Sequence, residues 1–408
     1  MFPTDQIFKI YLSKLFPTLL FFLIFGPKVF GTFFDIITIT SIFLIVTFSS
    51  RIPNMDKNVL GFFIVLFISQ FIFMVSGFFT ADIQNLMRPF RIVLNSLAVY
   101  YLLVAYFYKY KNNASEVFLN HLFFVISFHS LIMILQYISP QFRELIYWFT
   151  NPYEIVNVDL SIYIGTRILG LTYGLATTSM INLVAVLIYI YLRSNNFRIT
   201  HLHNICILLV VSSMFLCGRS GLALMLILVP IYFILQRKGF IKNIFYFLIL
   251  LIITYYFFTF YLPLYCKNFN CSMAVFSQLY WLQELFSFAI SGESKTISHV
   301  FKEISMPSEL ITYLIGGTST GIDSGYIKNI YQSGIFFSII SIFIYCIPLF
   351  YFRKIKKNPI ILLSIIVMFS ILIFQVKEMG FFVRGLWTIH LSFILLSILN
   401  LKTNFNKL

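Results

Sequence analysis

Long apolar runs separated by short polar spacers recur along the whole chain. A helix that crosses the roughly 30 Å hydrocarbon layer of a bilayer needs about 20 apolar residues. The pattern therefore predicts an all-α, polytopic integral membrane protein with about 12 transmembrane helices. Eleven or thirteen helices are alternatives, because the first, seventh and eighth runs are short. The expected spans are 10–26, 32–49, 59–79, 90–108, 117–138, 172–192, 203–217, 221–236, 243–262, 330–351, 360–376 and 385–401.

Composition agrees with this pattern. Of the 408 residues, 60% are hydrophobic and only 11% are charged. A soluble domain needs about 25% charged residues to coat its surface, so a soluble globular protein, a disordered chain and a nucleic-acid-binding domain are all excluded. The net charge of +15 does not indicate nucleic acid, because the basic residues lie in short spacers between apolar runs.

The distribution of basic residues predicts the orientation. With the N-terminus inside, 17 of the 29 basic residues fall in the inner loops beside three acidic residues, whereas the outer loops combine 12 basic with 10 acidic residues. Short cytoplasmic loops carry such an excess of Lys and Arg, so we expect both termini to be cytoplasmic. No cleavable signal peptide is expected, since no small-residue cleavage site follows the first apolar run.

The whole chain, 1–408, is expected to form a single polytopic membrane domain with unequal outer loops. The loop at 139–171 is of medium length, and the one at 263–329 is long. Apolar residues at helical spacing in the long loop predict short amphipathic helices on the outer face; re-entrant or additional membrane segments are the alternative. Cys266 and Cys271 at its start could form a disulfide in an oxidising outer compartment.

Outer arginines need an explanation other than orientation. A guanidinium group is planar, permanently charged and weakly hydrated, which suits binding of a phosphate at the membrane boundary. Snorkelling to lipid headgroups is the alternative for each of them. Arg167 and Arg219 favour function: Arg219 lies in Cys-Gly-Arg-Ser-Gly between two spans, and Arg167 begins Arg-Ile-Leu-Gly just before the sixth span. The outer set comprises Arg88, Arg91, Arg143, Arg167, Arg219 and Arg384.

Other candidate chemistry in the outer loops is sparse. His299 is the one outer-loop histidine, and it could take a proton near neutral pH or be an ordinary surface residue. The glycine-rich stretch 316–326 lacks the Lys-Ser/Thr ending of a nucleotide loop, so a flexible linker is the simpler interpretation. No metal-ligand cluster is evident, and no cofactor is expected. Within the spans only Asp35 is clearly acidic, which disfavours an ion-coupled transporter.

In this layout and in three motifs the chain resembles the bacterial O-antigen polymerases (Wzy-type), and more distantly the O-antigen ligases. The motifs are Arg167-x-x-Gly170 opening a span, the Gly-Arg219-Ser-Gly turn, and the region 316–334 with Asp323-Ser-Gly-Tyr running into the tenth span. These families are polytopic inner-membrane proteins with a large periplasmic loop in the second half, here 263–329.

The resemblance implies a metal-independent, inverting glycosyl transfer at the periplasmic face of the bacterial inner membrane. The substrates would be polyprenyl-diphosphate-linked oligosaccharides within the lipid bilayer, and a chain-length regulator protein would be a further partner. Fixed cations stabilise a departing diphosphate, and a base must accept the proton of the acceptor hydroxyl. The expected diphosphate-binding residues are Arg167 and Arg219, then Arg384, Arg88 and Arg91; the expected bases are His299, then Asp323 or Glu378.

Three other functions stay open at this point. An O-antigen ligase shares the chemistry but transfers a finished glycan to the lipid A core. A flippase or exporter of the lipid-linked sugar would also have about 12 spans, but its charges would line a central cavity and it would not need the long outer loop. A purely structural membrane scaffold is the third.

Overall fold

The computed structural model describes residues 14–29, 34–49, 55–80, 83–150, 168–172, 174–195, 197–236, 245, 248–249, 252, 256, 306–318, 324–355 and 358–399. Across these ranges the regular structure is almost entirely α-helical, which agrees with the predicted all-α class. The helices are α2 (Phe16–Phe25), α3 (Ile36–Ser49), α4 (Lys57–Thr80), α5 (Ile83–Tyr110), η1 (Lys111–Asn113), α6 (Ala114–Ile138), α7 (Pro140–Thr150), α10 (Leu175–Ser194), α11 (His201–Leu216), α12 (Arg219–Gln236), α17 (Leu310–Ile315), α18 (Gly325–Tyr345), η3 (Ile347–Lys354), α19 (Pro359–Lys377) and α20 (Leu386–Leu399). The strands are β1 (Lys28–Val29) and β2 (Phe34–Asp35).

Five helical segments in the described residues are long and apolar enough to cross a membrane. The other apolar helices have 10–17 residues, and at about 1.5 Å per residue they fall short of the roughly 30 Å of a hydrocarbon layer. The chain therefore has the character of an all-α membrane protein. The five segments are Lys57–Phe78, Leu86–Ile138, Leu175–Ser194, Gly325–Lys354 and Pro359–Lys377.

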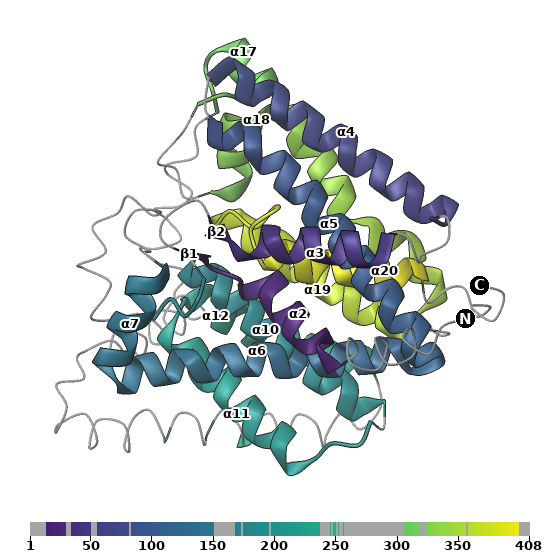
Figure 1. The fold of residues 1–408 in the computed structure, drawn as a ribbon, viewed down its shortest axis with the longest axis vertical. Helices are drawn as coiled ribbons and strands as arrows, with labels where there is room; N and C mark the ends of the chain where they lie inside the picture. The colour runs from purple at the N-terminus through teal and green to yellow at the C-terminus, as the bar shows by residue number, and fades with distance from the viewer. Residues whose placement is uncertain are drawn as a thin grey trace. The chain divides into compact units, whose positions relative to one another are not determined.

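The chain divides into two compact units. The first comprises Met1–Phe16, Ile37–Val117 and Lys295–Leu408, and the second comprises Pro17–Ile36 and Phe118–Ser294. In the first unit α4 packs against α5 and α18, α17 packs against α18, and α20 packs against α5 and α19 (Figure 1). Every residue of α20 is buried, so this helix forms the core of the first unit.

In the second unit α10 packs against both α11 and α12 (Figure 1). Residues 177–188 of α10 are all buried, although they include polar side chains. Asn182 satisfies its amide there: its Nδ2 donates to Ser213 Oγ at 2.9 Å, and its Oδ1 accepts from Ser130 Oγ at 3.4 Å. These bonds join α10 to α11 and α6. Helix α10 is therefore the central element of the second unit.

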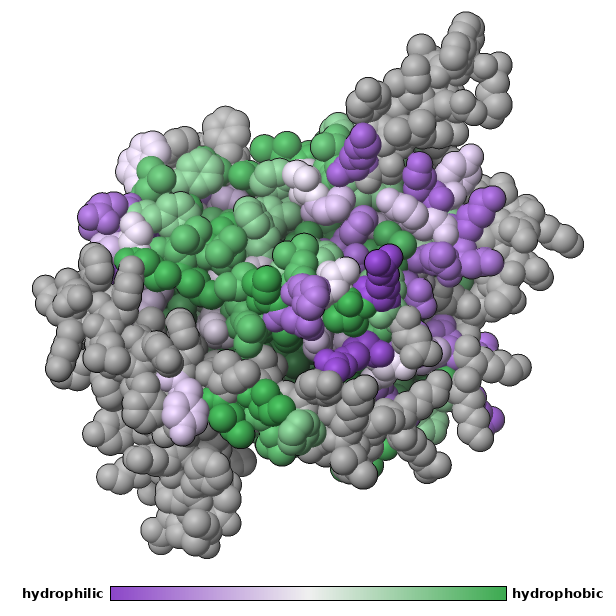
Figure 2. All heavy atoms as spheres, turned by 90° about the horizontal axis from the view of Figure 1, so that it is seen from below, coloured by the Kyte–Doolittle hydropathy of each residue, from purple (hydrophilic) through white to green (hydrophobic). Residues whose placement is uncertain are grey.

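Large apolar side chains also lie on the outer surface of the helices. One face of α4 exposes Leu60, Ile64, Phe67 and Phe71, each by roughly half or more. The space-filling view from below shows many further hydrophobic side chains on the surface, with hydrophilic side chains gathered mainly to one side of them (Figure 2). Exposed apolar side chains in such number suit contact with lipid rather than water. A bilayer environment follows from both the helices and the surface.

The structure differs from the sequence-based expectations at three places. The tenth expected span, 330–351, begins earlier, because α18 starts at Gly325 and its last part becomes the separate helix η3. The loop at 139–171 contains the helix α7. Asp35 does not lie in a span; it ends the strand β2, opposite Lys28 of β1. A charge is costly within a membrane helix, and the strand pair places it beside a cation instead.

Each expected span overlaps one of the helices, except 243–262, which lies mainly outside the described residues. The expected helices of the long outer loop are described only at α17, where Leu310–Ile315 is helical as predicted. Cys266 and Cys271 lie outside the described residues.

Candidate functional site

Helices α10 and α12 of the second unit begin side by side. A Cβ atom on Gly218, just before α12, would lie 2.7 Å from Ala176 Cα and 2.8 Å from Leu175 O in the first turn of α10. One turn further on, a Cβ atom on Gly221 would lie 2.5 Å from the carbonyl carbon of Ser179. Both glycines thus permit direct backbone contact. Because 218 faces 176 and 221 faces 179, the two helices are parallel.

This arrangement gathers positive partial charge at one place. The first N–H groups of a helix have no partner within the helix, and the helix dipole is positive at that end. Arg219 is the first residue of α12, and Gly174 precedes the first residue of α10. Two adjacent helix N-termini, one of which starts with an arginine, form an environment that favours an anion.

The segment that follows Arg167 is joined to the same place. The N–H of Ile168 donates to the carbonyl oxygen of Leu216 at 2.8 Å. Leu216 ends α11, three residues before Arg219. The two sequence motifs, which lie some fifty residues apart in the chain, therefore meet in space at the start of α12.

Two buried polar residues of α6 hold this segment in position. The Gly170 N–H donates to Gln136 Oε1 at 3.1 Å, and Gln136 Nε2 donates to Gly170 O at 3.4 Å. The Leu171 N–H donates to His129 Nε2 at 3.0 Å, and the imidazole stacks on the Phe25 ring with centroids 4.0 Å apart. The nitrogen that accepts this bond carries no proton, so the imidazole is neutral here.

Only glycine fits at position 170. Its φ is +68°, a backbone conformation that other residues adopt only at a cost. A Cβ atom there would also lie 2.6 Å from His129 Cε1 and 3.0 Å from Met133 Cγ. The glycine of the Arg167-x-x-Gly170 motif is thus explained by a positive φ and by close contact with α6.

The first unit holds a second set of candidates on the turn between α19 and α20, residues 378–385. Gln375 Oε1 accepts the N–H groups of both Gly380 and Phe381, the latter at 3.0 Å. The Phe382 N–H donates to the hydroxyl oxygen of Tyr345 at 2.8 Å, and Phe382 has a φ of +53°. Gly380, Phe381 and Phe382 are buried, and irregular backbone away from water needs such internal partners. Hydrogen bonds to Gln375 and Tyr345 therefore hold the turn that bears Glu378 and Arg384.

Arg88 of α5 lies near Tyr345, the residue that is hydrogen-bonded to this turn. Its guanidinium carbon lies 5.4 Å from the centroid of the Phe73 ring, a stacking geometry typical of arginine. It is also close enough to Arg91 and to Tyr345 to interact electrostatically with both. Tyr345 in turn holds Phe382 of the turn. Arg88, Arg91 and the α19–α20 turn thus belong to one neighbourhood.

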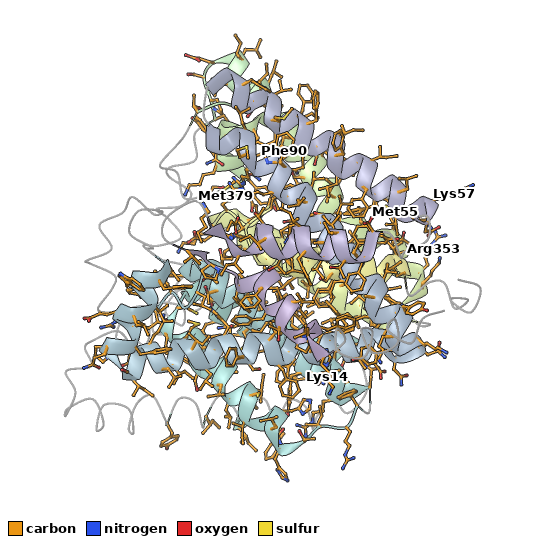
Figure 3. All side chains as sticks on the ribbon, viewed as in Figure 1. Lys14, Met55, Lys57, Phe90, Arg353 and Met379 are labelled. Carbon is orange, nitrogen blue, oxygen red and sulfur yellow. The ribbon has the colours of Figure 1, made fainter. Side chains whose placement is uncertain are left out.

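This neighbourhood lies away from the basic residues expected on the inner side. Figure 3 shows Phe90 and Met379, which neighbour the candidate residues in sequence, on one side of the first unit. Lys57 and Arg353, both in the expected inner set, lie on the opposite side of the same view (Figure 3). The two pairs of labelled residues thus lie on opposite sides of the first unit in this view, and which side faces the cytoplasm stays a prediction.

The structure thus groups the expected site residues by unit. Arg88, Arg91, Glu378 and Arg384 lie in the first unit, and Arg219 lies in the second. Arg167, His299 and Asp323 lie outside the described residues. In the part of the chain that the structure describes, no three His, Cys, Asp or Glu side chains gather as a metal site would require.

Sequence reasoning missed the residues that hold the site in place. His129, Gln136 and Gln375 lie within apolar runs, where a polar side chain usually faces the protein interior and marks a functional contact. His129 and Gln136 are also seven residues apart, which places them on one face of α6. That spacing was a usable signal. Their partners, by contrast, depend on how distant segments pack.

No family model matches the chain, and neither a curated protein nor a solved structure is significantly similar to it.

Proposed function

We propose that the protein is a polysaccharide polymerase of the O-antigen type. It joins polyprenyl-diphosphate-linked oligosaccharide repeat units by inverting glycosyl transfer, without a metal ion. The acceptor hydroxyl attacks the anomeric carbon of the donor sugar and loses its proton to a base. The bond between that carbon and the diphosphate oxygen breaks, and polyprenyl diphosphate leaves.

The paired N-termini of α10 and α12 are the observation that carries the proposal. The leaving diphosphate gains negative charge as the bond breaks, so preorganised N–H donors and cations lower the barrier. Arg219 begins α12. Ile168, the residue after Arg167, is hydrogen-bonded to Leu216, three residues before Arg219. We assign Arg167 and Arg219 to the diphosphate of the donor.

A second set of arginines fits the second substrate. In a polymerase the donor and the acceptor are both lipid-linked, so two diphosphates must be held at the same time. Arg88, Arg91 and Arg384 of the first unit supply a separate set of guanidinium groups, with Arg88 held against Phe73. We assign this set to the second lipid diphosphate. Glu378, on the same turn as Arg384, is a candidate base together with His299 and Asp323.

The proposal places the protein in a bacterial inner membrane with about 12 spans and cytoplasmic termini. Its substrates diffuse within the bilayer, and the reaction takes place at the periplasmic face. The long apolar helices support the membrane location. A chain-length regulator is the proposed protein partner.

The test is polymer formation in a strain that lacks the gene and carries a plasmid copy. We expect Arg219→Ala and Arg88→Ala to abolish the lipopolysaccharide ladder while the protein still inserts into the membrane. Arg353→Ala is the matched control, because Arg353 is exposed on η3 and belongs to the expected inner set; its ladder should be normal. Full ladders in both test variants would remove the arginines from the mechanism.

The deletion phenotype separates the alternatives. Loss of a polymerase leaves core plus one repeat unit, whereas loss of a ligase leaves core alone. Loss of a flippase would leave the lipid-linked repeat units on the cytoplasmic side of the membrane. The second test uses purified protein in liposomes. If it lengthens lipid-linked oligosaccharide without a transmembrane gradient, the result supports the polymerase proposal. If it does not lengthen the oligosaccharide with or without a gradient, the result contradicts that proposal.

A further inference from the structure

Helix α18 is broken at Gly334, where φ is 78° and ψ is 170°. The break frees carbonyl groups that would otherwise accept N–H bonds within the helix. Gln332 O instead accepts from the Gly317 N–H at 3.2 Å and from the Ser76 hydroxyl at 2.8 Å. Tyr331 O accepts from the Thr318 N–H at 3.0 Å. The backbone around the break is thus satisfied by the segment after α17 and by α4.

Glycine is required at this break. A Cβ atom on Gly334 would lie 2.6 Å from the carbonyl carbon of Leu314 in α17. Helices α17, α18 and α4 lie next to one another at this place (Figure 1). Broken helices in membrane proteins are a recurrent way to build polar binding sites within an apolar scaffold.

Unlike the backbone around the break, several side-chain atoms in the first part of α18 have no hydrogen-bond partner among the described residues. Asn329 and Ser333 are each only 1% exposed. Among the described residues, four atoms here have no hydrogen-bond partner: Asn329 Nδ2 and Oδ1, Gln332 Oε1 and Ser333 Oγ. Positions 329, 332 and 333 are three and four residues apart and share one helical face. Buried polar groups of this kind cost free energy unless something binds them.

Asn182 of the second unit shows what a structural buried asparagine looks like in this protein. It is 0% exposed, and both ends of its amide are paired, with Ser213 and Ser130. Asn329 is equally buried without such partners in the described residues. The two buried asparagines therefore differ: the amide of Asn182 is paired within its unit, and that of Asn329 is left without a partner among the described residues.

We propose that Asn329, Gln332 and Ser333 form a subsite that binds a neutral sugar ring of the lipid-linked glycan. The inference rests on the proposed function. Carboxamide and hydroxyl groups offer both donors and acceptors, which matches the adjacent hydroxyl groups of a sugar. The three residues carry no charge, so a diphosphate is not their ligand; the arginines of the proposed site serve that purpose. This subsite recognises the glycan and not the lipid anchor.

The experiment compares two probes on the full-length protein in nanodiscs. One probe is polyprenyl diphosphate bearing a repeat unit, extracted from cells that lack the gene, and the other is bare polyprenyl diphosphate. We expect Asn329→Leu and Ser333→Ala to weaken binding of the glycan-bearing lipid about tenfold. Binding of the bare lipid should stay at the wild-type level. The glycan-bearing lipid should therefore lose its advantage over the bare one.

Thermal unfolding of the same samples distinguishes a binding role from a structural one. Leucine replaces an unpaired amide with an apolar group of similar size, so the Tm of Asn329→Leu should equal or exceed that of the wild type. Asn182→Leu is the matched control, and its Tm should fall because the two hydrogen bonds that join Asn182 to Ser130 and Ser213 are lost. Ser333→Ala, a smaller change, provides the binding result independently of Asn329.

The outcomes separate this inference from the proposed function. If both variants bind the two lipids as the wild type does, or weaken both lipids equally, the subsite does not recognise a sugar and the inference is wrong. Those results leave the polymerase proposal standing. If the wild-type protein binds neither lipid, the polymerase proposal itself fails.

Discussion

The substitution Gly218→Ala tests whether the contact between the starts of α10 and α12 matters for activity. The added methyl group would lie 2.7 Å from Ala176 Cα, 2.8 Å from Leu175 O and 2.9 Å from Ala176 N. All three atoms belong to the backbone of α10, so no side-chain rotation can relieve the clash. The helices must move apart.

The size of the effect follows from these distances. Carbon atoms pack at about 3.5–4.0 Å, so the first turns must separate by about 1 Å. Overpacking of this kind costs about 1–3 kcal/mol of stability. The larger effect is on catalysis, because a displacement of about 1 Å of a catalytic group lowers a rate by about 100-fold. We expect the polymer ladder to be lost although most of the protein still folds.

The assay combines gel analysis of the polymer with protein level and thermal unfolding in detergent. Gly61→Ala is the matched control, since among the described atoms nothing lies within 4 Å of a Cβ at that position of α4. Alanine is favoured over glycine within a helix by about 1 kcal/mol, so this variant should keep its ladder and its Tm. A full ladder in Gly218→Ala, with or without a lower Tm, would refute the link between this contact and function.

Three further predictions concern single side chains. Gln136→Leu removes both hydrogen bonds to Gly170, so we expect polymer to be lost at a normal protein level on gels and immunoblots. Gln375→Leu leaves the N–H of Gly380 without its acceptor and should destabilise the protein by about 1–3 kcal/mol, measured by thermal unfolding; Gln375→Glu retains the acceptor and should restore most of the Tm. Arg88→Met keeps the apolar stem but removes the charge, so the Tm should change little while liposome polymerisation falls; unaltered polymerisation would argue against a role for this cation.

Much of the fold could be predicted from local pattern. Apolar run length is a property of each segment alone, because any such run must bury its backbone in a helix when water is absent. The expected spans at 59–79, 90–108 and 360–376 accordingly coincide with α4, α5 and α19. The number of spans that cross a membrane stays a prediction beyond the five long segments.

The candidate site could be predicted only in its chemical types. Outer arginines and motif glycines are visible as residues in unusual places, but Arg219, expected in the turn between two spans, is the first residue of α12. The expected span 330–351 falls within the apolar segment Gly325–Lys354, but run length did not predict the break at Gly334, which leaves an apolar pattern unchanged while it redirects the backbone. Hydropathy does not report a single positive φ.

What each segment becomes was thus determined by sequence alone: all-α, apolar and built for a bilayer. Which segments meet was decided only by tertiary packing. Ile168 is hydrogen-bonded to Leu216, Gln136 to Gly170, and Tyr345 to Phe382, and the two members of each pair lie far apart in the sequence. The physical reason is that a hydrogen bond or a close glycine contact depends on two backbones at once, whereas hydrophobic periodicity describes only one.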